Sequence, residues 1–149
     1  NARFPDAASG EKVAALFARE NLNPFTPALS AFWSMSQGLF TKAIQKADLA
    51  LQINPQFTDA YLVEGLSYCN LDKFPEAEAA YTQALALEPN FTLLYLLRAG
   101  VRQGQGNLTG ALSDLGMVQT GPQAEQFKEY VKAAMLGTLS CKNALTYTP

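Results

Sequence analysis

The sequence contains no histidine, so it lacks the side chain that most often activates a nucleophile or binds a transition metal. Neither a Ser-His-Asp nor a Cys-His arrangement can form without it. The two cysteines, Cys69 and Cys141, are too few for a structural zinc site. We therefore expect a protein that is not an enzyme, with no catalytic residue, no metal site and no cofactor.

Charged residues are also scarce, at 16% of the chain, and 11 Lys and Arg nearly balance 13 Asp and Glu. Nucleic-acid binding depends on a basic surface, so we expect no nucleic-acid partner. No apolar run approaches the ~18 residues of a membrane-spanning helix, so we expect no membrane span. The chain begins at Asn1, as a processed form or an excised segment would. We expect a cytoplasmic protein, or a periplasmic or otherwise exported one if the missing N-terminus was a cleaved signal.

The clearest positive feature is an internal repeat. The chain has 149 residues, 48% of them hydrophobic, which suits a single domain with its own core. Compared with itself at an offset of 34 residues, the sequence aligns Ala43 with Ala77 and Ala111, and Pro55 with Pro89. Small residues and prolines at a fixed period of this length indicate stacked supersecondary units.

The middle unit, residues 58–91, resembles a tetratricopeptide repeat. That family has the pattern W-x2-L-G-x2-Y, then A-x3-F, then P. Glu64 departs from the pattern by replacing the leucine. The first unit keeps its alanines but lacks the aromatics, and the third is intermediate. The residues of the middle unit that carry the resemblance are Tyr61, Gly65, Tyr68, Ala77, Tyr81 and Pro89.

The resemblance implies an all-α, right-handed α-solenoid of three helix-turn-helix hairpins. Residues 9–22, with Val13, Leu16 and Phe17 on one face, look like the second helix of a degenerate upstream unit. A helix near the C-terminus is expected to cap the array, because the last repeat has no neighbour. The expected single domain comprises an N-terminal helix (1–23), a degenerate first repeat (24–57), a second repeat (58–91), a third repeat (92–125), a capping helix (123–137) and a tail (138–149).

Phe57-Thr58 and Phe91-Thr92 predict the starts of two first helices. Threonine is a preferred N-cap, and the preceding phenylalanine can pack onto an apolar residue in the first turn. Phe25-Thr26-Pro27 carries the same signal two residues late, so the first helix of the first repeat is expected to be short.

The resemblance also implies where a ligand would bind, because the first helices of such hairpins line a concave groove. The family's carboxylate clamp for acidic chaperone tails needs Lys, Asn and Arg there. This chain has Ala28, Phe32, Leu66, Leu96 and Gly100 instead, which argues against that ligand. The predicted partner-binding residues are Phe25, Phe32, Met35, Asp59, Leu62, Leu66, Asn70, Leu93, Leu96 and Gln103.

An apolar groove of this kind has two possible occupants. The first is a protein or peptide partner, either apolar or an amphipathic helix, which makes the protein an interaction module such as an adaptor, scaffold or assembly factor. The second is the protein itself, through its terminal segments or a second copy in a homo-oligomer, because large apolar patches are rarely left exposed. The sequence leaves both open.

Three further side chains have structural and functional interpretations. Glu64 and Arg98 occupy equivalent places in successive repeats, so we expect a structural ion pair between them rather than a catalytic carboxylate or an anion site. Trp33 could anchor a ligand, although such a ring more often packs between helices. Cys69 is expected to be a small buried hydrophobe, since a disulfide to Cys141 would need the tail to fold into the groove.

Overall fold

Seven helices and no strand make up the residues that the computed structural model describes, which are 23–140, 142 and 143. The predicted N-terminal helix lies outside these residues, apart from Asn23. The helices are α2 (Phe25–Ser36), α3 (Phe40–Ile53), α4 (Thr58–Asn70), α5 (Phe74–Leu87), α6 (Thr92–Gly104), α7 (Leu108–Gln119) and α8 (Lys128–Met135).

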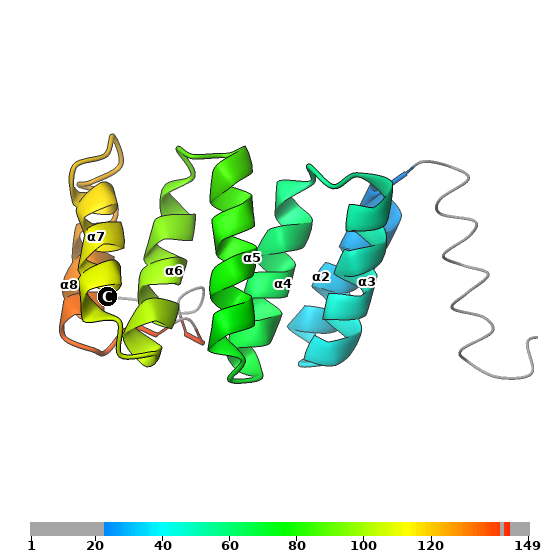
Figure 1. Ribbon diagram of the computed structural model, residues 1–149, viewed down its shortest axis with the longest axis horizontal. Coiled ribbons are helices and arrows are strands. Elements are labelled where there is room, and N and C mark those ends of the chain that lie inside the picture. The colour runs from blue at the N-terminus through cyan, green and yellow to red at the C-terminus, as the bar shows by residue number, and fades with distance from the viewer. Residues whose placement is uncertain (1–22, 141, 144–149) are drawn as a thin grey trace, which may run out of the picture.

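The helices form antiparallel hairpins that stack in a row, α2–α3, then α4–α5, then α6–α7, with α8 beside the last hairpin (Figure 1). The first helices α4 and α6 also contact the second helices of the preceding hairpins, α3 and α5. This arrangement confirms the predicted all-α helical-repeat fold.

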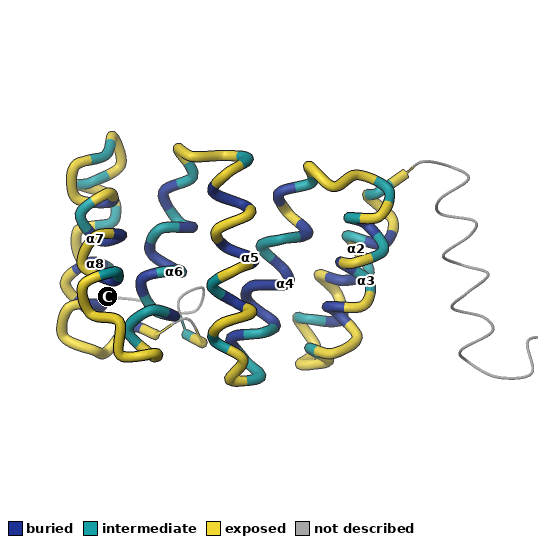
Figure 2. The backbone as a smooth tube through the Cα atoms, viewed as in Figure 1, coloured by how far each residue is buried: buried dark blue, intermediate teal, exposed yellow. Residues whose placement is uncertain are grey.

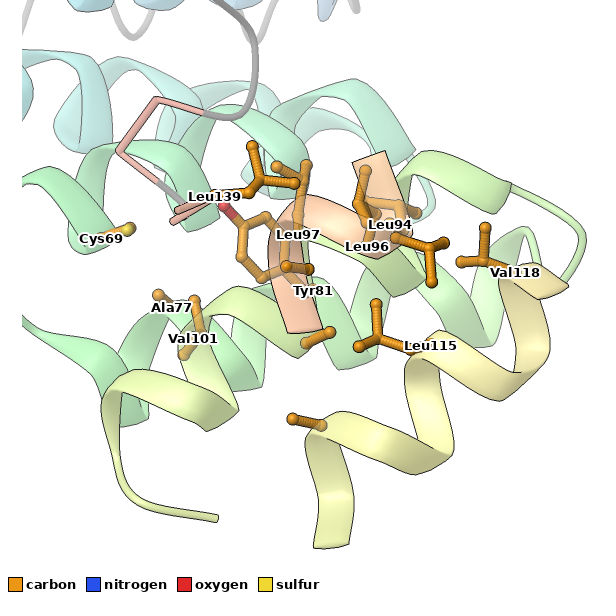
Figure 3. Close-up of a cluster of buried hydrophobic side chains, with 14 of the residues drawn as sticks. Cys69, Ala77, Tyr81, Leu94, Leu96, Leu97, Val101, Leu115, Val118 and Leu139 are labelled. Atoms are coloured by element: carbon orange, nitrogen blue, oxygen red, sulfur yellow. The ribbon is translucent and has the colours of Figure 1, made fainter. Parts of the chain in front are cut away.

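Small side chains allow the hairpins to approach closely. Ala43, Ala47 and Ala50 of α3 are fully buried in one cluster with Val63 of α4. A second, larger cluster joins the two later hairpins to α8, and the fully buried ring of Tyr81 lies within it (Figure 3). Buried residues therefore run along the inner faces of the whole row (Figure 2).

Gly65 is required by this packing, because a Cβ added there would lie 2.6 Å from Tyr81 Cδ1. We expect Gly65→Ala to destabilise the protein by about 2 kcal/mol, since the cost of overpacking exceeds the gain in helix propensity. Urea denaturation of the full chain measures the change. Gly116→Ala in α7 is the matched control, because nothing lies within 4 Å of its added Cβ, and it should stabilise slightly. Equal effects at the two sites would contradict the proposed contact.

α4 and α6 start where the sequence predicts, at Thr58 and Thr92, but no side chain caps either N-terminus, so the predicted threonine caps are wrong. Both threonines are buried. The side chain that does cap a helix is Asn107, whose Oδ1 accepts a hydrogen bond from the Gly110 backbone N at 3.0 Å.

Two helix lengths also differ from expectation. α2 has 12 residues against 13 for α4 and α6, so the first helix is shortened only slightly. α8 has 8 residues and begins at Lys128, whereas the prediction placed the capping helix at 123–137. Turns occupy the segment around Pro122, which lacks the backbone N–H that a helix interior needs. No helix among the described residues is long and apolar enough to cross a membrane.

Candidate functional site

An apolar cleft lies between α2 and α4. Its volume is about 250 Å³, and α2 supplies the side chains on one wall while α4 and the residue before it supply the other. The row of hairpins fixes both walls, because α4 packs against α2 and α3. The lining residues are Phe25, Ala28, Leu29, Phe32, Phe57, Asp59, Leu62 and Val63.

Aromatic rings and one carboxylate give the cleft its chemistry. The Phe25 and Phe57 rings meet edge to face, with centroids 5.2 Å apart, and Phe32 is more than half exposed. Asp59, in the first turn of α4, is the only charged residue of the lining. Such a surface can accept apolar side chains and can favour a positive charge beside them, but it carries no set of groups suited to acid–base or nucleophilic catalysis.

Four of the ten predicted partner-binding residues line this cleft: Phe25, Phe32, Asp59 and Leu62. Leu29, Phe57 and Val63 also line it and were not predicted. Phe57 directly precedes Thr58, so in the sequence it indicates the start of a helix and not the wall of a cleft. The other six predicted residues lie elsewhere: Leu66 and Leu96 are buried, whereas Met35, Asn70, Leu93 and Gln103 are partly buried.

Leu66 and Leu96 belong to the large buried cluster of the later hairpins, which also contains Leu139 of the C-terminal segment. Gly137, with a φ of +77°, turns the chain after α8, and Leu139 then enters the same buried cluster (Figure 3). Lys142 Nζ lies 2.6 Å from Oδ1 of Asp72, just beyond the end of α4. The C-terminal segment thus adds to the core of the later hairpins, whereas the cleft between α2 and α4 is open.

Cys69, near the end of α4, differs in part from the prediction that it is a small buried hydrophobe. It is fully buried, as expected, but it is also disulfide-bonded. The sequence has one other cysteine, Cys141, which lies outside the described residues.

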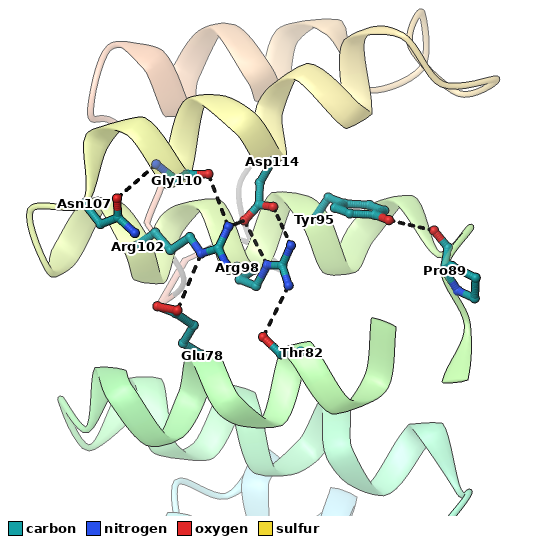
Figure 4. A network of polar contacts seen from close by, with 9 residues as sticks. All are labelled: Glu78, Thr82, Pro89, Tyr95, Arg98, Arg102, Asn107, Gly110 and Asp114. Carbon is teal, nitrogen blue, oxygen red and sulfur yellow. Dashed lines mark hydrogen bonds and ion pairs between the residues drawn. The ribbon is translucent and has the colours of Figure 1, made fainter. Parts of the chain in front are cut away.

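The predicted Glu64–Arg98 ion pair is wrong. Arg98 instead binds Asp114 of α7 through two hydrogen bonds, of 2.7 Å from Nη2 and 3.0 Å from Nε (Figure 4). Arg102 Nη1 lies 3.2 Å from the same carboxylate, and its Nε lies 3.5 Å from Oε2 of Glu78. The two arginines therefore link α5, α6 and α7, and their positive charge is already balanced by acidic partners.

The positions of Glu64 and Arg98 within the repeat explain why the predicted ion pair between them does not form. Arg98 also donates from Nη1 to Thr82 Oγ1 at 3.2 Å, and Glu64 hydrogen-bonds with Asp48, which lies 34 residues before Thr82. Residues at this place thus face the second helix of the preceding hairpin and not each other. Glu64 is buried there, and desolvation together with the neighbouring Asp48 raises its pKa from 4.5 to about 9. Its carboxyl group is therefore protonated at neutral pH.

The described residues contain no group of three or more Cys, Asp or Glu side chains that could hold a metal ion. The carboxylates of the cleft and of the arginine network are dispersed or paired.

Comparison with known proteins agrees with this description. The family model for the tetratricopeptide repeat matches residues 58–91, which form α4, α5 and the connection that follows α5. A comparison with curated proteins found no match. Repeats of this family generally mediate protein–protein interactions. Residues 58–91 are therefore a tetratricopeptide repeat, and the described part of the chain that contains them is an all-α helical repeat.

Proposed function

We propose that the protein is a non-catalytic interaction module, an adaptor, scaffold or assembly factor, that binds an amphipathic helix or apolar peptide in the cleft between α2 and α4. The observation that carries this proposal is the cleft itself, about 250 Å³ in volume and lined almost entirely by apolar side chains. Helix-in-groove recognition uses such surfaces, with apolar anchors spaced along one face of the partner.

The partner engages the early part of the groove. Leu66 and Leu96 are buried, whereas Phe25 and Phe32 are exposed. Occupation of the groove by terminal segments and binding of an outside partner are thus compatible, because they use different parts of it.

Asp59 adds a preference of charge. As the only charged residue in the lining, it favours a partner that carries Lys or Arg next to its apolar anchors. The disulfide at Cys69 indicates an oxidising compartment, because such bonds persist mainly in oxidising environments. An exported protein is therefore favoured over a cytoplasmic one.

Phe32→Asp is expected to weaken partner binding about 30-fold or more, since it removes roughly 2 kcal/mol of apolar contact and adds a charge to be desolvated. The probe is a fluorescein-labelled peptide selected from a random display library on the wild-type chain, with Kd measured by fluorescence anisotropy. We expect the selected peptides to share apolar residues at helical spacing with a basic neighbour.

Leu112→Asp is the matched control, because Leu112 on α7 is 56% exposed and Phe32 is 57% exposed. This control should bind as tightly as the wild type. If both variants bind every selected peptide unchanged, the cleft is not the binding site. Sedimentation at several concentrations tests the alternative function, self-association, which predicts a dimer that Phe32→Asp dissociates.

A further inference from the structure

Two large apolar side chains on α2 are exposed at the end of the array. Leu29 is 70% exposed and Trp33 is 67% exposed, although Trp33 was expected to pack between helices. The residues 34 positions later, Val63 and Ser67, are buried. The residues 68 positions after Leu29 and Trp33, which lie in α6, are also buried. Leu29 and Trp33 thus occupy places that are covered in both later hairpins.

The covering element in the later hairpins is the second helix of the preceding hairpin. Val63 lies in one buried cluster with Ala43, Ala47 and Ala50 of α3. Leu97, the equivalent residue of α6, lies in a cluster with Tyr81 of α5 (Figure 3). Among the described residues no helix precedes α2, so the corresponding face of the first hairpin has no cover.

The sequence before α2 contains residues in the register of such a covering helix. Counting back 34 positions from Ala47, Ala50 and Leu51 of α3 leads to Val13, Leu16 and Phe17. The same three places in α5 are held by buried residues. The apolar residues Val13, Leu16 and Phe17 therefore match in register the residues that α3 and α5 turn toward the next hairpin. The equivalent residues of α5 are Tyr81, Ala84 and Leu85.

The connection between residues 9–19 and α2 is about as long as the equivalent connections in the later repeats. In this register residue 19 corresponds to Ile53, the last residue of α3, which leaves residues 20–24 before α2 begins at Phe25. Residues 54–57 make the equivalent connection between α3 and α4, and residues 88–91 make it between α5 and α6. A connection this short favours packing onto the adjacent α2 of the same chain over exchange with a second copy.

We propose that residues 9–19, which lie outside the described residues, form a helix that docks on Leu29 and Trp33 of the same chain. Val13, Leu16 and Phe17 supply the contact. This interface is separate from the proposed partner site, although Leu29 lies at the border of the two. With the helix docked, the open part of the cleft is centred on Phe25 and Phe32.

The single tryptophan makes this interface directly measurable, because all tryptophan fluorescence of the full chain comes from Trp33. In the wild type we expect emission typical of a shielded indole and weak quenching by acrylamide. The double variant Leu16→Asp/Phe17→Asp should shift the emission to longer wavelength and raise the quenching constant severalfold. Circular dichroism should show that the described hairpins remain folded.

Ala18→Asp is the matched control, since residue 18 lies on the opposite side of the proposed helix, and it should leave the fluorescence unchanged. A wild-type Trp33 as accessible to acrylamide as N-acetyltryptophanamide would overturn the proposal. So would equal quenching in wild type and double variant. Shielding that disappears on dilution, with a dimer in sedimentation, would assign the cover to a second copy and overturn docking within one chain. None of these readouts uses the partner peptide, so they are independent of the proposed function.

Discussion

Asp114→Asn is expected to lower the free energy of unfolding by about 3 kcal/mol or more, because breaking a buried ion pair leaves its partners uncompensated. Asp114 is 2% exposed and accepts hydrogen bonds from both Arg98 and Arg102. The neutral amide keeps the size of the side chain but removes the charge that balances the two guanidinium groups. Urea denaturation of the full chain at neutral pH measures the loss.

Asp72→Asn provides the matched control for this prediction. Asp72 also pairs with a basic residue, Lys142, but its side chain is 66% exposed. Exposed ion pairs contribute about 0–1 kcal/mol, so this variant should unfold almost as the wild type does. Asparagine also tolerates the positive φ of 59° at this position. Losses of equal size in the two variants would show that burial does not set the strength of the Asp114 network.

The register of small residues explains why the fold could be predicted from the sequence. Ala43 and Ala77 align at the period of the repeat and are both fully buried where helices approach. Only small side chains fit at such places, so packing imposes the period on the sequence. The period alone does not show which helix a polar side chain faces. Glu64 and Arg98 face Asp48 and Thr82 on the preceding second helices and not each other, so the predicted pair is wrong.

The candidate site was predictable only in part, because its limits depend on an aperiodic segment. Phe25, Phe32, Asp59 and Leu62 follow from the repeat register, and the structure brings them together around one cleft. In the later hairpins, the tail residue Leu139 joins the buried cluster from outside the repeats. No pattern in the sequence distinguishes this leucine from a solvent-exposed one, so its position required the structure.

Glu64→Gln is expected to stabilise the protein increasingly as the pH rises. Burial and Asp48 raise the pKa of Glu64 from 4.5 to about 9, so between these values the unfolded chain releases a proton that the folded chain retains. The unfolded state then binds fewer protons, and wild-type stability falls by up to about 1.4 kcal/mol per pH unit. Glutamine is neutral in both states and avoids this cost. At pH 8 the variant should exceed the wild type by about 3 kcal/mol or more, and at pH 4 the two should be nearly equal.

The test is the free energy of unfolding by urea at pH 4, 6 and 8 for wild type and variant. Glu88→Gln is the matched control, because Glu88 is exposed at the end of α5, and its difference from wild type should stay small across this range. A stabilisation by Glu64→Gln that does not change with pH would mean that Glu64 keeps an ordinary acidity in the folded state. A destabilisation that grows with pH would mean that the folded state holds Glu64 as a carboxylate with a cationic partner. The expected sign follows from Asp48, since an acidic neighbour and a buried site both disfavour the charged form.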